Sequence, residues 1–179
     1  IFRFVGWYAN HDVRNSGFSL EEKIQMVKAV EPYMTVYVSS EKALPDGLLK
    51  YKLPTPASQI HNVLSFADLY LGDSQTMATE AALLGTPAIR SNSFVGDGDM
   101  SNFKMLEQKY GLLKNVAEFE DVLSLLKVWA SSSKKAEWKE KQSGYFESVG
   151  DSNEEIKANN TELNRLNASQ KLFTASMSH

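Results

Sequence analysis

The sequence predicts an α/β fold built on a doubly wound parallel sheet, and three observations indicate this class. Short apolar runs rich in β-branched and aromatic residues alternate with segments whose apolar residues recur at helical spacing. Parallel strands need a crossover connection, usually a helix, so this alternation favours a parallel sheet with helices on both faces. The stretch from Leu69 to Arg90 contains a complete strand, helix and strand.

The elements expected in the first half of the chain follow from their end signals. Ser19-Leu20-Glu21-Glu22 is a capping box that opens a helix, and Pro32 ends it. Thr55-Pro56 fits an N-cap followed by proline at the first helical position. In order, we expect a strand over residues 1–8, a polar loop over residues 9–17, a helix over residues 20–30, a strand over residues 34–39, a third, short and extended strand near residues 51–53, a helix that carries Ile60 to Ala67, and the unit from Leu69 to Arg90.

The second half is expected to be mostly helical. In order, we expect a glycine-bearing loop over residues 90–99, a helix from Ser101 to Lys109, an edge strand at Leu112-Leu113, an amphipathic helix over residues 119–129, and a Lys/Glu-rich helix over residues 134–146 that Gly150 ends. From Asp151 onward the composition becomes rich in Asn, Ser, Glu and Lys. The sequence therefore predicts a Rossmann-like domain over residues 1–149 and a polar tail over residues 150–179 that is weakly helical or disordered.

Composition and charge argue against several classes of function. A formal net charge of −3 does not favour nucleic-acid binding, because proteins that bind the phosphate backbone carry excess basic charge. The chain has no cysteine, which excludes disulfides and thiolate metal sites and suits a cytoplasmic location. No apolar run reaches membrane-spanning length. The chain opens without an initiator Met or a signal-peptide pattern, so we expect a fragment whose upstream part is missing.

The strongest candidate for a ligand site is the helix start inside the unit from Leu69 to Arg90. Asp73 and Ser74 follow the strand directly, and Gln75 and Thr76 begin the helix. The unpaired N–H groups at a helix start and its positive dipole end attract anions such as phosphate. Asp73 and Ser74 also fit a plain N-cap, a role that is compatible with phosphate binding.

Glu80 is the only charged residue between Met77 and Leu84, where the other side chains are mostly small or aliphatic. Helix geometry places it two turns beyond Asp73 on nearly the same face, about 10 Å along the axis. A nucleotide whose phosphates lie at the helix start would present its ribose hydroxyls to this carboxylate. The alternative is an ion pair, for which Arg90 at the end of the next strand is the nearest candidate partner.

Two histidines are further candidates. His11 and Asn15 lie in the loop after the first predicted strand, at the carboxyl edge of the sheet, where ligands bind in open α/β folds. His61 lies at the start of its helix at the same edge, and it is a candidate for contacting a nucleotide base. The alternative for His11 and Asn15 is a solvated loop. The chain lacks the glycine-rich fingerprints of P-loop and dinucleotide-binding proteins.

Two motifs resemble those of a known family. Asp73-Ser74, Glu80-Ala81 and Leu84-Gly85-Thr86-Pro87 resemble the Asp-Ser-Gly-Gly-x-x-Glu-Glu-Ala-x-x-Leu-Gly-x-Pro run in the C-terminal domain of UDP-N-acetylglucosamine 2-epimerases. The segment from His11 to Gly17 resembles the His-Arg-Arg-Glu-Asn-x-Gly loop after the first strand of that domain. The Ser-to-Glu spacing is the same in both, and the two motifs occur in the same order.

A second resemblance is closer. The run from Gly72 to Gly96 resembles a bacterial and archaeal family of unknown function that is predicted to consist of glycosyltransferases of the GT-B type, which have two Rossmann domains. The resemblance covers roughly Ile1 to Leu126 and implies the C-terminal half of a GT-B fold. Ser91 to Gly96 replaces the Thr-Glu-Arg-Pro-Glu segment of the epimerases, a difference that favours a transferase over an isomerase.

The resemblance also implies roles for individual residues. Ser74 and the N–H groups of Gln75 and Thr76 would hold the diphosphate of a nucleotide-sugar, Glu80 would hold its ribose, and the Pro54–His61 region would border its base. His11 would approach the diphosphate or the sugar and is the one catalytic candidate. Asp73, Arg90, His61 and Asn15 complete the expected substrate-binding set.

The expected function is therefore that of a donor-binding domain that forms one half of a site. The chain would bind a UDP-linked sugar as substrate, without metal or cofactor, in a glycosyltransferase of surface polysaccharide biosynthesis. A missing N-terminal Rossmann-like domain of the same protein would complete the site, so the chain alone is expected to bind without turnover. The alternatives are a UDP-N-acetylglucosamine 2-epimerase-like isomerase domain and a non-catalytic nucleotide-binding or interaction domain.

Overall fold

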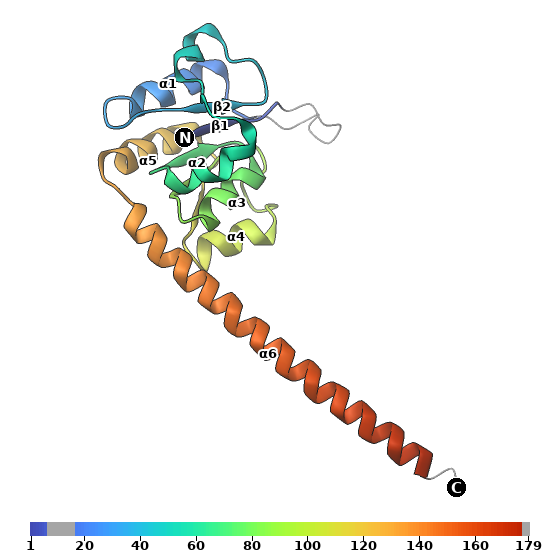
Figure 1. Cartoon of the computed structure of the whole chain (residues 1–179). Helices are drawn as coiled ribbons and strands as arrows, with labels where there is room; N and C mark the ends of the chain where they lie inside the picture. Colours follow the sequence, from blue (N-terminus) through green and yellow to red (C-terminus); the bar gives the residue numbers. More distant parts are fainter. Residues whose placement is uncertain (7–16, 177–179) are drawn as a thin grey trace. The chain divides into compact units, whose positions relative to one another are not determined.

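The computed structural model describes residues 1–6 and 17–176, with side chains up to residue 165 (Figure 1). Residues 7–16, which include His11 and Asn15, and residues 177–179 lie outside the described part. The elements are, in order, β1 (Phe2–Phe4), α1 (Leu20–Val30), β2 (Val38–Ser40), the 3₁₀ helices η2 (Asp46–Tyr51) and η3 (Ala57–Gln59), α2 (Ile60–Phe66), β3 (Tyr70–Gly72), α3 (Gln75–Leu83), β4 (Ala88–Arg90), α4 (Ser101–Gln108), β5 (Leu113–Asn115), α5 (Phe119–Ser131) and α6 (Lys135–Ser176).

The strands form a parallel sheet in the order β2-β1-β3-β4-β5. The chain moves from β1 to β2 in one direction and then crosses back to β3 and onward in the other. The strand order therefore reverses between β1 and β3, and ligands of open α/β sheets bind at the carboxyl ends of the strands at such a point. The predicted doubly wound parallel sheet is confirmed.

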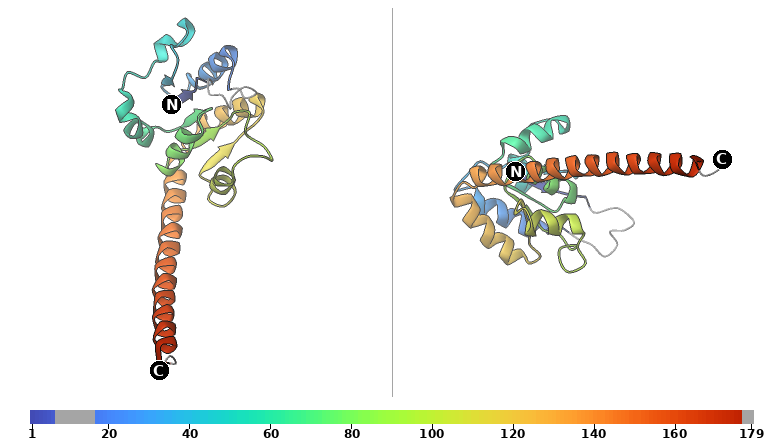
Figure 2. Two further views of the ribbon diagram at one scale, coloured as in Figure 1. Left: turned by 90° about the vertical axis from the view of Figure 1, so that its right-hand side faces the viewer. Right: turned by 90° about the horizontal axis from the view of Figure 1, so that it is seen from below.

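Helices cover both faces of the sheet. Right-handed crossovers place α1 on one face and α2, α3 and α4 on the other, because the chain reverses its direction across the sheet after β2. Helix α5 packs against α1, and Figure 2 shows these two helices side by side. This arrangement leaves the carboxyl edge of β1 and β3 bordered by α1 on one side and α3 on the other.

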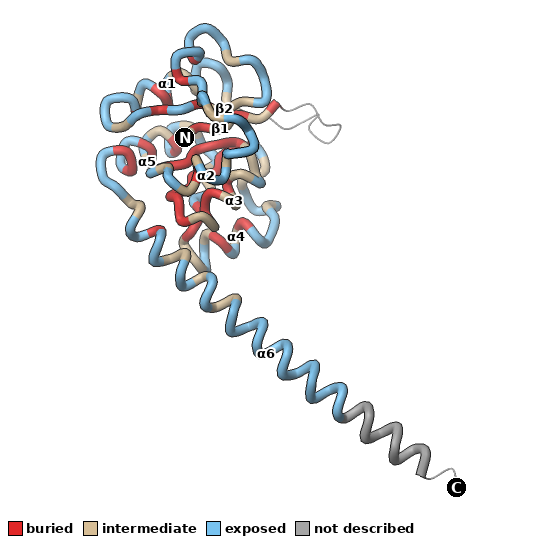
Figure 3. The backbone as a smooth tube through the Cα atoms, viewed as in Figure 1, coloured by how far each residue is buried: buried red, intermediate tan, exposed pale blue. Residues whose placement is uncertain are grey.

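The core explains why the central strands are so apolar. Tyr70, Leu71 and Ile89 in β3 and β4 are all fully buried, as expected for strands covered on both faces. Figure 3 shows that the buried segments are concentrated in the α/β unit, whereas most of the described length of α6 is exposed. The buried face of α3 consists of Ala78, Ala81 and Ala82. Small side chains let this helix approach the sheet closely, so α3 brings its first turn directly to the ends of the strands.

Two expectations for the first half of the chain are changed by the structure. Residues 51–53 do not form a strand of the sheet, since η2 runs through Tyr51 and only an isolated bridge joins Lys52 to Val38. The helix expected from Thr55 begins instead as η3, and α2 starts at Ile60. Pro56 is the N-cap of η3, whereas the sequence predicts Thr55 as the N-cap and Pro56 as the first helical residue.

The C-terminal helix is longer than expected. We predicted that Gly150 would end it, yet α6 is 42 residues long and continues through Gly144 and Gly150 to Ser176. A glycine ends a helix by adopting a left-handed conformation, and neither of these glycines has a positive φ. Residues 151–165 of α6 are all exposed. The chain divides into two compact units, residues 1–142 and residues 143–179, so the first turns of α6 belong to the α/β unit.

Trp138 anchors the start of α6 within the α/β unit. Its indole N–H donates to the carbonyl of Leu112 at 2.7 Å, and its ring lies 4.8 Å from that of Trp129 in a T-shaped contact. Within the described ranges, no helix combines the length and apolarity needed to cross a bilayer.

Candidate functional site

The carboxyl end of β3 leads directly into α3, as the sequence predicts. Ser74 is the N-cap residue, and its hydroxyl oxygen accepts a hydrogen bond from the N–H of Met77 at 3.3 Å. Gly72 precedes this turn, and a Cβ at Gly72 would lie 2.7 Å from the carbonyl oxygen of Arg3. Glycine is therefore needed for β3 to pass β1 this closely. The turn exposes Thr76 and half-buries Gln75, so the start of α3 is open to a ligand.

Asp73 connects the two strands at the point where the strand order reverses. Its carboxylate accepts a hydrogen bond from the N–H of Val5 at 2.8 Å, and its own carbonyl accepts one from the side-chain amide of Asn92 at 2.9 Å. Asp73 is 1% exposed. Asp73 thus connects the carboxyl ends of β1 and β3 with the segment after β4, and its buried carboxylate holds this edge of the sheet together.

Glu80 lies where helix geometry predicts, but its ion-pair partner is not Arg90. A carboxylate oxygen of Glu80 lies 3.4 Å from Nε2 of His61, so α2 and α3 meet through these side chains. The Glu80 side chain is 34% exposed and that of His61 is 62% exposed, which leaves both within reach of a ligand. The structure brings these two candidates together although each was predicted from a separate signal.

Arg90 is fully buried and has a different role from the one that the alternative for Glu80 required. Its guanidinium forms an ion pair with Asp99 and stacks over the ring of Phe103 at 3.8 Å. Burial lowers the pKa of Arg90, and the adjacent Asp99 carboxylate opposes that shift. The alternative that paired Arg90 with Glu80 is therefore wrong, and Arg90 connects the loop after β4 to the sheet through Asp99 instead.

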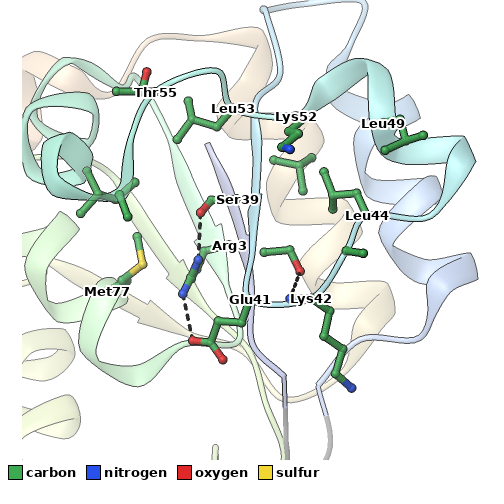
Figure 4. Close-up of a pocket in the computed structure, with 15 residues that line it drawn as sticks. Arg3, Ser39, Glu41, Lys42, Leu44, Leu49, Lys52, Leu53, Thr55 and Met77 are labelled. Carbon is green, nitrogen blue, oxygen red and sulfur yellow. Dashed lines mark hydrogen bonds and ion pairs between the residues drawn. The ribbon is translucent and has the colours of Figure 1, made fainter.

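A cavity of about 520 Å³ lies beside α3 at the carboxyl ends of β1 and β2 (Figure 4). Leu53, Thr55 and Ile60 line it from the segment before and within α2, and Met77 lines it from α3. Thr55 and Ile60 belong to the region between Pro54 and His61 that the family resemblance implies would border a base. The volume is within the range of sites for small organic ligands.

Arg3 gives this cavity a polar floor. Its guanidinium donates to the hydroxyl of Ser39 and to the carboxylate of Glu41, each at 2.9 Å (Figure 4). The other oxygen of Glu41 accepts from the N–H of Gly6 at 3.0 Å. Sequence reasoning missed Arg3 and Glu41. The available signal was a charged residue between Phe2 and Phe4 in a strand, which places Arg3 on the face opposite to these two rings.

The α3 helix relates these features to one another. Ser74, Met77 and Glu80 are spaced by three residues, so each is a neighbour of the next on the helix surface, while Ser74 and Glu80 lie about 120° apart around the axis. Ser74 lies at the open helix start, Met77 lines the large cavity, and Glu80 meets His61. The chain can thus offer an anion site, a cavity and a hydrogen-bond acceptor for hydroxyls within two turns of one helix.

Comparison with models of known protein families and with curated protein sequences finds no match. Across the part of the chain that the structure describes, no cluster of three or more His, Asp or Glu side chains is arranged to hold a metal ion. The candidate site therefore depends on its geometry: a Rossmann-like parallel sheet with a ligand-accessible edge at β1, β2 and β3.

Proposed function

We propose that this chain is the nucleotide-sugar-binding domain of a GT-B-type glycosyltransferase that uses a UDP-linked donor in surface polysaccharide biosynthesis. The observation that carries the proposal is the order of features along α3. The helix start at Ser74 suits a phosphate, the cavity beside Met77 suits a nucleoside, and Glu80 suits ribose hydroxyls.

The proposed pose follows from the dimensions of the helix. Ser74 and Glu80 are separated by six residues, which corresponds to about 9 Å along the axis. The diphosphate would accept hydrogen bonds from the first N–H groups of α3, and the two ribose hydroxyls would donate to the Glu80 carboxylate. The base would then enter the cavity between Leu53 and Ile60, above the Arg3 guanidinium.

The chemistry assigned to this domain is stabilisation of the leaving group. In glycosyl transfer the nucleoside diphosphate departs with a developing negative charge, and the positive end of α3 favours that charge. An acceptor and a general base would come from the N-terminal domain expected upstream, with His11 near the reacting groups. The chain alone would therefore bind the donor without turnover.

Calorimetric titration with UDP and UDP-N-acetylglucosamine tests the proposal. We expect wild-type binding to weaken about 10- to 100-fold in Glu80→Gln, because a charge-assisted contact to the ribose is lost. Glu120→Gln, at an exposed carboxylate in the first turn of α5, serves as the control and should bind like the wild type.

A deoxy ligand makes the test specific for the ribose. 2′-Deoxy-UDP should bind wild type more weakly than UDP, whereas Glu80→Gln should lose most of its ability to distinguish the two. Absence of binding by either UDP ligand to the wild type would refute the proposed function. If Glu80→Gln lost the same affinity for UDP and for 2′-deoxy-UDP, only the assignment of Glu80 to the ribose would be refuted.

A further inference from the structure

A second cavity, of about 220 Å³, lies on the other face of the sheet beside α1. Phe4 lines this cavity, whereas its neighbour Arg3 lines the larger one, because successive residues of a strand point to opposite faces. The segment from Ser40 to Leu44 lines both cavities except at Glu41, so it separates them at the carboxyl end of β2.

Two lysines line the small cavity. Lys23 comes from the first turns of α1 and Lys42 from the segment after β2. The Nζ of Lys23 lies 4.9 Å from the centre of the Phe4 ring, which places the ammonium group over an aromatic wall of the cavity. In Figure 4 the Lys42 side chain extends away from the Arg3–Glu41 pair of the larger cavity.

The electrostatic environment connects Lys23 with the reversal point of the sheet. Burial lowers the pKa of Lys23, the Asp73 carboxylate opposes this shift, and the positive charge of Lys42 adds to it. The charge of Lys23 therefore interacts both with the Asp73 carboxylate, at the end of β3, and with the Lys42 ammonium group, after the end of β2. The two like charges share one small cavity at the edge of the sheet where ligands bind.

The carboxylates around this cavity already accept hydrogen bonds from other groups. Glu22 accepts from the N–H of Ser19 at 2.7 Å in the capping box, and Asp73 accepts from the N–H of Val5. Glu41 accepts from Arg3 and Gly6. These bonds fix the positions of the acidic groups, and the basic residues Lys23 and Lys42 both line the cavity.

We infer that the cavity beside α1 binds a phosphoryl group through Lys23 and Lys42. Each ammonium group is a point charge with three donors and suits the oxygens of a tetrahedral oxyanion. The volume corresponds to about seven water molecules at about 30 Å³ each, so the phosphoryl group and part of the molecule that carries it both fit. Phe4 and Phe18 supply an apolar wall for that part.

Two sources of the phosphoryl group share this chemistry. One is the diphosphate of the proposed nucleotide-sugar, reaching across the ends of β1 and β3, and the other is a separate phosphorylated ligand. The inference does not depend on the proposed function, because the small cavity and the cavity beside α3 lie on different faces of the sheet.

Titration of the chain with inorganic pyrophosphate tests the inference. Wild type should bind, and Lys23→Met and Lys42→Met should each weaken binding about tenfold or more, because one charge-assisted contact is lost. Lys23→Arg should retain most of the affinity. Lys28→Met, an exposed position in the last turn of α1, is the matched control and should leave binding unchanged.

The outcomes separate this inference from the proposed function. Absence of pyrophosphate binding, or equal binding by wild type, Lys23→Met and Lys42→Met, would overturn the phosphoryl site. Competition between UDP and pyrophosphate identifies the nucleotide diphosphate as the source, and simultaneous binding of both identifies a separate ligand. If UDP fails to bind the wild type while pyrophosphate binds through the lysines, the nucleotide proposal fails and the phosphoryl site stands.

Discussion

Replacing Asp99 with alanine should destabilise the protein severely, because the change leaves a buried positive charge without its partner. The Arg90 side chain is 0% exposed and that of Asp99 is 4% exposed. Arginine keeps its charge in proteins, so Arg90 cannot avoid the penalty by losing a proton. The Phe103 ring that it contacts at 3.8 Å supplies only part of the lost stabilisation.

The expected magnitude follows from the burial of the pair. Removing one partner of a buried ion pair costs roughly 3–5 kcal/mol, which is a large part of the roughly 5–15 kcal/mol that stabilises a typical protein. At about 2–4 °C per kcal/mol for a chain of this size, the midpoint of thermal unfolding should fall by roughly 6–20 °C. The double variant Arg90→Met/Asp99→Ala should recover much of this loss, because no buried charge remains.

Urea denaturation and thermal unfolding followed by circular dichroism measure both effects. Asp97→Ala is the matched control, because Asp97 lies in the same loop with an exposed side chain. A loss for Asp99→Ala within about 0.5 kcal/mol of the control would refute the structural role of the pair. The structural role would also be refuted if the double variant lost as much free energy of unfolding as Arg90→Met and Asp99→Ala lose together. Such additivity would mean that the two charges do not interact.

Two further changes test the packing of the α/β unit. Gly72→Ala should destabilise the protein by about 1–3 kcal/mol in urea denaturation, because its Cβ would press on the backbone of β1. The control Gly98→Ala, where a Cβ would meet nothing within 4 Å, should have little effect. Equal effects of the two variants would contradict the close approach of β1 and β3. Lys135 donates to the Ser65 carbonyl at 2.8 Å, and burial together with the neighbouring charge of Lys139 lowers its pKa to about 8. The unfolded chain therefore holds this proton more tightly between pH 8 and its ordinary value of 10.5, so the stability of wild type relative to Lys135→Met should rise with pH across that window in urea midpoints. A difference that stays constant with pH would contradict this expectation.

The fold could be predicted because its signals are local. A capping box at Ser19 and apolar periodicity mark α1, and the apolar runs of β3 and β4 identify strands buried on both faces. The end of α6 could not be predicted from Gly150, because a glycine permits a left-handed turn without requiring it. The segment at residues 51–53 was likewise ambiguous, since an extended residue joins a sheet only if a neighbouring strand accepts it.

The candidate site was predictable only in part. Ser74 at the start of α3 and Glu80 two turns later follow from helix geometry, which any sequence of that pattern obeys. Arg3 and Lys23 gave no motif, because each becomes a site residue through side chains that are distant in the chain. His11 and Asn15 lie outside the described residues, and their expected roles stay predictions.

Local sequence patterns were thus sufficient for the parallel α/β class, the order of its elements and the helix start at Ser74, since hydrophobic periodicity and capping act between residues a few positions apart. The choice of partners required the folded chain. Glu80 pairs with His61 rather than Arg90, and Arg90 is buried against Asp99, because strand order and crossover direction set which side chains meet. Side-chain type and spacing alone do not encode those distances.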